Sequence, residues 1–350
     1  MEKIISDLYV ELKKERTNLI NKASLDSNIE KSELEKEFED SLLALKCLSI
    51  QTNRLLQPEK VFVPNYNKKS IISRIPKGKI LQILPSTTPL LSCILLPLCA
   101  VIVGNQVIVK PSSKSKSIAI FLEKFFKKEN LKNIKFKIGS GKDFLFKILK
   151  DDYDFVFFMG SEENGKEINE YCNKREIEYS GEYGGNDWAI IIDGNLKKIS
   201  YKIAENVKFK EGRDCDSIKG VLINSKVYRP FVDLLKNSLK DIKIKENPLD
   251  KDIINPEFCS SLWIKKFSSE EEILSLYKKN KHGLSSSIFC KDTKKALELA
   301  KKINTARVII NSDTLDIHPL IPWGGIKSTS RGGVDYWINK FSNKKLIEIS

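Results

Sequence analysis

Short apolar runs alternate with amphipathic, helix-forming runs through residues 79–173. KILQIL, QVIVK and DFVFFMG have the length and the β-branched or aromatic content of buried strands, and SIAIFLEKFFKK has helical periodicity. This alternation predicts βαβ units and a parallel sheet covered by helices on both faces. A second alternating block begins with AIIID at residue 189 and includes KGVLI, SSSIF and RVIIN. The fold class that we expect is therefore α/β, with two α/β domains on parallel sheets.

Residues 1–57 precede these blocks and differ from them in character. Their charged, amphipathic pattern predicts an N-terminal helical segment of two helices. Ser32 and Glu35 have the spacing of a capping box, so we expect the second helix to begin there. No residue pattern in this segment indicates chemistry.

The apolar and basic residues do not form the patterns of a membrane protein or a nucleic-acid-binding protein. The most apolar stretch, PLLSCILLPLCAVIVGN, is shorter than the roughly 20 apolar residues that span a bilayer, and Pro97 interrupts it. We expect a buried helix there. The net charge is +14, but the lysines are spread over the whole chain and only eight of the 60 basic residues are arginines. Proteins that read nucleic acids favour arginine and cluster their charge on one face, so we expect no nucleic-acid partner. Because the apolar stretch is too short to span a bilayer, we also expect no membrane partner.

The cysteines and the N-terminus indicate the compartment. The seven cysteines are odd in number and widely spaced, without a CxxC pair or a Cys/His cluster. This spacing offers no metal-ligand set, so we expect no metal site. The N-terminal stretch MEKIISDLYVELKKERTN is charged throughout and lacks the apolar segment of a secretion signal. We therefore expect reduced thiols in a cytoplasmic protein.

Two positions in the first block could hold a phosphate group. The strand DFVFFMG runs into GSEENG, so Gly160 allows a tight turn and Ser161 can begin a helix whose N-terminal amides favour an anion. In VIVKPSSKS, Lys110 ends a strand and is followed by proline and small hydroxyl residues that can reach ribose or phosphate. Each pattern alone is also typical of an ordinary turn or a solvated lysine.

Together and in order, the motifs resemble those of the aldehyde dehydrogenase superfamily, from about Ser73 to the C-terminus. The matching stretches are GNQVIVKPS, FFMGS, GEYGGNDWAIIID, GRDC, GLSSSIF, ARVIIN and PWGGIKSTSRGG. Their order is much more specific than any one of them. The resemblance implies an aldehyde-dehydrogenase-like fold, with this chain as a short and divergent member of the superfamily.

The resemblance also implies a covalent chemistry. The thiolate of Cys215 would add to an aldehyde, and hydride transfer to a nicotinamide would leave a thioester. Glu182 would then activate water to release the acid. The glycines that follow Glu182 allow close backbone approach, and Arg213 is expected to lower the pKa of Cys215. Thr87 stands where the family usually has an oxyanion-stabilising asparagine, and supplies a hydroxyl instead of an amide.

The cofactor implied by the resemblance is NAD or NADP. The expected cofactor-binding residues come from the strand ends and turns of the motifs: Pro85, Lys110, Ser112, Gly160, Ser161, Gly165, Glu257 and Phe258. Ser113 replaces a glutamate that commonly binds the adenosine ribose in the family. Because its loss removes a repulsion against a 2′-phosphate, NADP is admissible beside NAD. Arg213 likewise replaces a glutamine, and the segment between Cys215 and NPEFCSSLW is short for the family.

The resemblance assigns the domains and an oligomeric state. Residues 1–57 form the N-terminal helical segment, 58–184 the dinucleotide-binding domain and 185–335 the catalytic domain. Residues 336–350 are expected to return to the dinucleotide-binding domain as an edge strand. Because an exposed strand edge can pair with another chain, we expect a homodimer.

Three functions remain open from the sequence. The first is an NAD(P)-dependent oxidation of a small-molecule aldehyde to a carboxylic acid. The second is the reverse chemistry, an NAD(P)H-dependent reduction of an acyl thioester, because PSTTP at residues 85–89 is similar to the PSTNP turn of acylating relatives. The third is a non-catalytic binding protein on the same fold, which the changes at Thr87 and Arg213 would allow.

Overall fold

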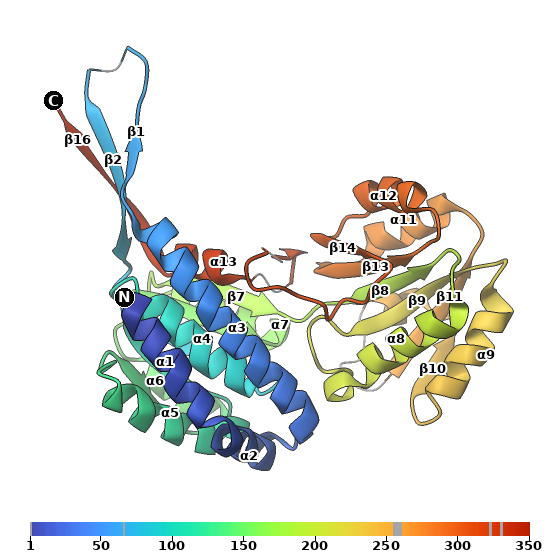
Figure 1. Ribbon diagram of the computed structural model, residues 1–350, viewed down its shortest axis with the longest axis horizontal. Helices are drawn as coiled ribbons and strands as arrows, with labels where there is room; N and C mark the ends of the chain where they lie inside the picture. The colour runs from blue at the N-terminus through green and yellow to red at the C-terminus, as the bar shows by residue number, and fades with distance from the viewer. Residues whose placement is uncertain (1, 66, 255–260, 322–323, 330–331) are drawn as a thin grey trace. The chain divides into compact units, whose positions relative to one another are not determined.

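The computed structural model describes residues 2–65, 67–254, 261–321, 324–329 and 332–350 (Figure 1). The chain forms two compact units. The first comprises Met1–Gly181, Pro319–Pro322 and Gly332–Ser350, and the second comprises Glu182–His318 and Trp323–Arg331. Of the helices that the structure describes, none has both the length and the apolar character needed to cross a bilayer.

A five-stranded sheet forms the centre of the first unit. Its strands, in spatial order, are β5 (Ile134–Phe136), β4 (Gln106–Lys110), β3 (Lys79–Ile83), β6 (Phe155–Gly160) and β7 (Glu178–Tyr183). β3 pairs in parallel with β4 and with β6, and β4 pairs in parallel with β5. The strands predicted from KILQIL, QVIVK and DFVFFMG are therefore confirmed.

Helices connect these strands, as the alternating pattern predicts. They are α4 (Pro89–Val101), α5 (Lys116–Lys128), α6 (Gly141–Leu149) and α7 (Glu162–Asn173). α4 is the predicted buried helix, with nearly every side chain inaccessible to solvent and Pro97 inside it. The short turn η1 (Ser113–Ser115) joins β4 to α5.

The N-terminal segment contains three helices, so the prediction of two was wrong. They are α1 (Glu2–Lys14), α2 (Arg16–Ser27) and α3 (Lys31–Leu56). A single residue, Glu15, interrupts the helical path between α1 and α2, and Asn28 ends α2 in a left-handed conformation with φ of 58°. The predicted capping box was also wrong, because α3 begins one residue before Ser32 and its N-cap, Glu30, makes no side-chain capping bond.

The long helix α3 is tied to α4 by a buried carboxylate. Glu37 is only 4% exposed, and its Oε1 accepts hydrogen bonds from the backbone amides of Leu90 (2.7 Å) and Leu91 (3.0 Å). These amides belong to the first turn of α4, where backbone N–H groups lack partners within the helix. The negative charge also complements the positive end of the helix dipole. A residue from α3 thus caps α4, which makes the N-terminal helices part of the first unit.

The C-terminal segment returns to the first unit through α13 (Val334–Lys340) and β16 (Ser342–Ile349). Asn105 holds it there, because its Nδ2 donates to the carbonyl of Phe341 (2.8 Å) and its Oδ1 accepts from the amide of Gly78 (3.0 Å). The ring of Phe341 also packs edge-on against Phe155 and Phe157 of β6.

The terminal strand lies in a sheet of its own. β16 pairs antiparallel with β2 (Lys69–Pro76), which pairs antiparallel with β1 (Glu59–Val61). In Figure 1 these three strands project from the rest of the first unit, with β16 at the edge. An edge strand was predicted for residues 336–350; the strand begins only at Ser342, because α13 occupies the start of that range, and it does not join the five-stranded sheet.

A six-stranded sheet forms the centre of the second unit, and every pairing in it is parallel. Its strands, in spatial order, are β10 (Lys243–Glu246), β11 (Ser261–Phe267), β9 (Ile218–Asn224), β8 (Asp187–Ile191), β13 (Ser285–Phe289) and β14 (Arg307–Ile310). The strands predicted from AIIID, KGVLI, SSSIF and RVIIN are confirmed. β12 (His282–Gly283) and β15 (Ile326–Lys327) form a separate two-stranded antiparallel sheet.

Successive residues of these strands face two different layers of helices. Ala189 and Ile191 pack on one face with α8 (Leu196–Lys208) and α9 (Tyr228–Ser238). Trp188 and Ile190 pack on the other with α11 (Glu270–Lys279) and α12 (Thr293–Lys302). This alternation buries the sheet on both sides, as expected for a parallel sheet. The short helix α10 (Asp250–Ile254) follows β10.

We predict that Glu37→Ala lowers the free energy of unfolding by about 1 to 3 kcal/mol, because two amides at the start of α4 lose their acceptor. Urea denaturation followed by circular dichroism measures this change. Glu35→Ala is the matched control on the same helix, since Glu35 is exposed, its ion pair with Arg16 is long at 3.7 Å, and its loss should matter by less than about 1 kcal/mol. Equal losses in the two variants would contradict the capping role of Glu37.

Candidate active site

Cys215 lies at the end of the six-stranded sheet where its parallel strands begin, which we call the amino edge. It sits in the loop between the turn η2 (Phe209–Gly212) and β9, and its side chain is half-buried. β8, β13 and β14 run parallel to β9, so their first residues come to the same edge. Asp187, Ser285 and Arg307 are those first residues. Parallel pairing therefore gathers four chain segments around the thiol.

Gly185 makes close approach to the cysteine loop possible. A Cβ atom on Gly185 would lie 2.4 Å from the backbone oxygen of Cys215 and 3.1 Å from Oδ1 of Asp187. No side chain fits in that space, which explains one of the two glycines that follow Glu182. Glu182 itself is 1% exposed and lies in β7, three residues before this glycine.

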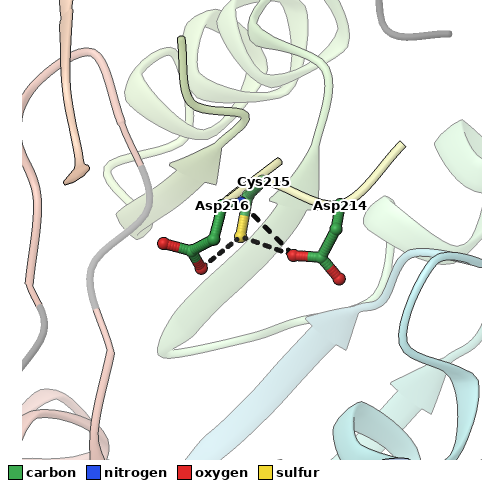
Figure 2. Close-up of side chains that lie close together, drawn as sticks. All are labelled: Asp214, Cys215 and Asp216. Atoms are coloured by element: carbon green, nitrogen blue, oxygen red, sulfur yellow. Dashed lines mark hydrogen bonds between the residues drawn. The ribbon is translucent and has the colours of Figure 1, made fainter. Parts of the chain in front are cut away.

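Two carboxylates flank the thiol (Figure 2). The Cys215 Sγ donates to Oδ2 of Asp216 at 3.4 Å and lies 3.7 Å from Oδ1 of Asp214. The same Asp214 oxygen accepts the backbone amide of Asp216 at 3.2 Å. The thiol hydrogen is therefore held between two carboxylate groups.

Asp216 is fixed by residues of the neighbouring strands. Its Oδ1 accepts the hydroxyl of Ser285 at 3.0 Å and lies 3.7 Å from Nη1 of Arg307. Arg307 in turn donates to the carbonyl of Thr314 at 2.8 Å. Asp216 is only 2% exposed, so this ion pair and these hydrogen bonds offset the cost of burying its charge.

The charge around Cys215 is the opposite of the one that the sequence suggested. Burial raises the pKa of the Cys215 thiol well above its ordinary value, and the carboxylates of Asp216, Asp214 and Asp187 raise it further. Arg213 was expected to lower this pKa, and that prediction was wrong. The guanidinium of Arg213 pairs with Glu211 at 3.0 Å, and it is not among the groups that shift the thiol.

Two of the carboxyl groups are themselves shifted toward the neutral form. Burial, followed by the charge of Asp214, raises the pKa of Asp216 to about 6, although Arg307 opposes the shift. Burial and the charge of Asp216 raise the pKa of Asp187, whose Oδ1 accepts the amide of Ser285 at 3.0 Å. β8 has an irregular register at Asp187, a feature common where a strand aims a side chain into a site.

The cofactor-binding residues predicted in the first unit lie where the parallel strands of its sheet end, which we call the carboxyl edge. Pro85 and Thr87 follow β3, Lys110 ends β4 and Gly160 ends β6. In open α/β sheets, ligands bind outside the carboxyl ends of the strands. The structure thus brings to one edge residues that are far apart in sequence, while the roles assigned to them, including that of Thr87, stay predictions.

The same edge has features that suit an anionic cofactor. Ser161 is the N-cap of α7 and accepts the amide of Asn164 at 3.4 Å, and Gly165 is buried within that helix. Ser112 accepts the amide of Lys114 at 3.2 Å in the turn after β4. Burial lowers the pKa of Lys110, which is half-buried at the strand end. Glu257 and Phe258 lie outside the described residues.

Sequence reasoning did not find the residues that surround the thiol. Asp187, Asp216, Ser285 and Arg307 all stood in stretches with recognisable motifs, but no role was assigned to them. The usable signal was positional, because three of these residues open strands that pair in parallel beside β9.

In the part of the chain that the structure describes, Asp214, Cys215 and Asp216 have potential ligand atoms within 4.8 Å of one another. We assign no metal to this group, since the Asp216 carboxylate already binds Ser285 and Arg307. The absence of a metal site stays a prediction.

The chain matches the sequence pattern of the aldehyde dehydrogenase family over residues 2–256 and 250–347. It is 25% identical over 313 residues to a lactaldehyde dehydrogenase of Methanococcus maripaludis, which covers 71% of this chain and 67% of that protein. It is 24% identical over 347 residues to aldehyde dehydrogenase NAD(P)+ 1 of Saccharomyces cerevisiae, with 78% of this chain and 68% of that protein covered.

Its fold is similar to that of a betaine aldehyde dehydrogenase of Staphylococcus aureus crystallised with NAD+. The TM-score is 0.90 at 20% identity, with 99% of this chain and 81% of that chain covered. This likeness confirms the predicted fold class, α/β with parallel sheets.

We predict that iodoacetamide alkylates Cys215 slowly at neutral pH, because only the thiolate reacts and the pKa of this thiol is raised. The alkylation rate should keep increasing with pH above about 8.5, the ordinary thiol pKa. Mass spectrometry of the peptide that contains Cys215 measures the rate at each pH. The urea-unfolded protein is the control, since its thiol loses the surrounding carboxylates. A half-maximal rate at lower pH in the folded protein than in the unfolded protein would contradict the raised pKa.

Proposed function

Because the chain belongs to the aldehyde dehydrogenase family, we propose that it oxidises a small-molecule aldehyde to a carboxylic acid through a thioester on Cys215. The observation that carries this proposal is the placement of Cys215. Its half-buried thiol is hydrogen-bonded at a sheet edge, and Gly185 packs directly against its backbone. A thiol in this position can form a covalent bond with a carbonyl carbon while its backbone stays fixed.

We propose that the hydride acceptor is NAD or NADP. The carboxyl edge of the first unit fits a dinucleotide, since the N-terminus of α7 presents amides and Lys110 presents a cation. When bound, the nicotinamide accepts the hydride that leaves the substrate carbon. The Staphylococcus aureus relative was crystallised with NAD+, and the yeast relative carries NAD(P)+ in its name. Ser113, in place of a carboxylate, makes NADP acceptable.

Glu182 is proposed as the base for hydrolysis. It is almost fully buried and stands three residues before Gly185, the glycine that contacts the cysteine loop. A carboxylate there can take a proton from the water that attacks the thioester, and this step releases the acid and frees Cys215 for the next cycle.

Reduction of an acyl thioester is the second candidate. The turn PSTTP at residues 85–89, which resembles that of acylating relatives, favours it. An aldehyde product would leave without hydrolysis, so this function would not require water activation by Glu182.

We further propose that the protein is a homodimer that pairs through β16. Among the strands that the structure describes, β16 has only β2 as a neighbour, and three of its apolar side chains are exposed: Leu346 (56%), Ile347 (43%) and Ile349 (51%). A second copy of the chain could both complete the backbone hydrogen bonds of the edge and cover these side chains.

For the chemistry, we predict that Cys215→Ala abolishes turnover, whereas Glu182→Gln gives one burst of NAD(P)H and then a steady rate lowered by roughly 10² to 10⁴. Stopped-flow absorbance with lactaldehyde and either NAD+ or NADP+ measures both phases. Glu178→Gln is the matched control in the same strand, because Glu178 is exposed and forms a surface ion pair with Lys77 at 2.5 Å. Rapid NAD(P)H-dependent reduction of an acyl-CoA, unaffected by Glu182→Gln, would favour the second candidate instead.

For the assembly, we predict that the double variant Leu346→Lys and Ile347→Lys sediments as a monomer, because two charges on each edge strand repel the partner strand. Sedimentation velocity measures the change from the dimeric wild type. Leu25→Lys, which adds a charge at a side chain that is 79% exposed on α2, is the control and should remain dimeric. A dimeric double variant would refute pairing through β16.

A further inference from the structure

The carboxylates beside Cys215 create a difficulty for the proposed chemistry. A free thiolate at this position would place a negative charge beside those of Asp214 and Asp216, with Asp187 close by. Like charges in a poorly solvated site repel strongly. A mechanism that begins with a standing thiolate therefore does not suit this site.

We propose that Asp216 is a catalytic base, which takes the proton of Cys215 as the thiol adds to the substrate carbonyl. This inference rests on the proposed function and adds a residue to it. Oδ2 of Asp216 is the closest acceptor of the thiol hydrogen, at 3.4 Å from Sγ. A base within hydrogen-bond reach of the proton that it removes meets the first requirement of general base catalysis.

The anchoring of Asp216 leaves that oxygen aimed at the thiol. Ser285 and Arg307 both engage Oδ1, at 3.0 and 3.7 Å, so Oδ2 is the oxygen that faces Sγ. The positive charge of Arg307 also favours the ionised carboxylate, the form that can accept a proton.

Asp214 is a poorer acceptor by the same criteria. Its Oδ1 lies farther from Sγ, at 3.7 Å, and already accepts the backbone amide of Asp216. Its Oδ2 lies 3.9 Å from Nζ of Lys210. Asp214 therefore contributes mainly negative charge.

The step balances without any further reactant. The S–H bond breaks and its proton moves to Oδ2 of Asp216, while Sγ forms a bond with the carbonyl carbon. The π electrons of the carbonyl move to its oxygen. The negative charge thus passes from Asp216 to the substrate oxygen, so the number of charges near Cys215 does not increase and no thiolate is formed beside the carboxylates.

The base form of Asp216 exists only above its pKa, which burial and Asp214 raise to about 6. The groups that face it also include Arg307 and Ser285, which oppose the shift, and Asp187, whose pKa the charge of Asp216 raises. As pH falls through about 6, Asp216 becomes protonated and cannot accept the thiol proton. The rate of the first chemical step should fall in that window.

The decisive experiment compares two reactions of Cys215 in the same variants. In Asp216→Asn, the NAD(P)H burst with lactaldehyde should slow by roughly 10² to 10⁴, the usual contribution of a general base. Alkylation by iodoacetamide at pH 7 should instead become faster, since loss of a negative charge favours the thiolate. A role that is only structural would not move these two rates in opposite directions.

Asp214→Asn is the matched control, because it removes a charge beside the same thiol and keeps the base. Both alkylation and the burst should become faster in this variant. If Asp216→Asn also accelerates both reactions, Asp216 acts only by its charge and the inference is overturned.

The remaining outcomes separate this inference from the proposed function. A wild-type burst rate in Asp216→Asn, with Cys215→Ala inactive, would overturn the role of Asp216 and leave the oxidation intact. Absence of any NAD(P)H formation by the wild type, as a burst or as steady turnover, would overturn both. If circular dichroism shows that Asp216→Asn does not fold, measurements on the wild type test the inference instead. Its burst should be slower in D2O and should decline below about pH 6, and a burst indifferent to both would refute the inference.

Discussion

Parallel pairing of β8, β9, β13 and β14 is the constraint on which the candidate site depends. Because these strands run in the same direction, their first residues meet at one edge of the sheet. Asp187, Ser285 and Arg307 come from three different strands, and the loop that carries Cys215 enters a fourth. The tight contact between Gly185 and the Cys215 carbonyl fixes the loop against that edge.

The buried charges of this edge form a network in which each member depends on the others. Removing Arg307 would leave Asp216 buried without its cation, and such uncompensated charges are among the costliest defects in a protein. The same network gives the thiol a negative environment. Where a neighbouring cation would stabilise a thiolate, these carboxylates stabilise the thiol and offer an acceptor for its proton. The site therefore combines a protonated thiol with a nearby carboxylate acceptor.

The first unit uses buried polar groups in a different way, to join segments that are distant in sequence. Glu37 of α3 caps α4, and Asn105 holds the carbonyl of Phe341 next to the five-stranded sheet. These bonds place the N-terminal helices and the C-terminal strand around the sheet. The carboxyl edge of the same sheet carries Lys110 and the N-terminus of α7, so its capacity for an anionic ligand comes from the strand and helix ends themselves.

The sequence by itself determined the α/β class, most of the strands in both blocks and the family. Hydrophobic periodicity and the order of motifs can be observed along the chain without knowledge of its three-dimensional contacts. It also pointed to Cys215 through the motif that contains it. It did not reveal the break at Glu15, which turned two expected helices into three, since a single residue's backbone conformation depends on its packing. Only the tertiary structure decided the charge around the thiol. Arg213 is close in sequence but turns to Glu211, whereas Arg307 and Asp187 are remote in sequence and arrive through strand pairing. Electrostatic influence follows distance in space, and that distance is set by the fold.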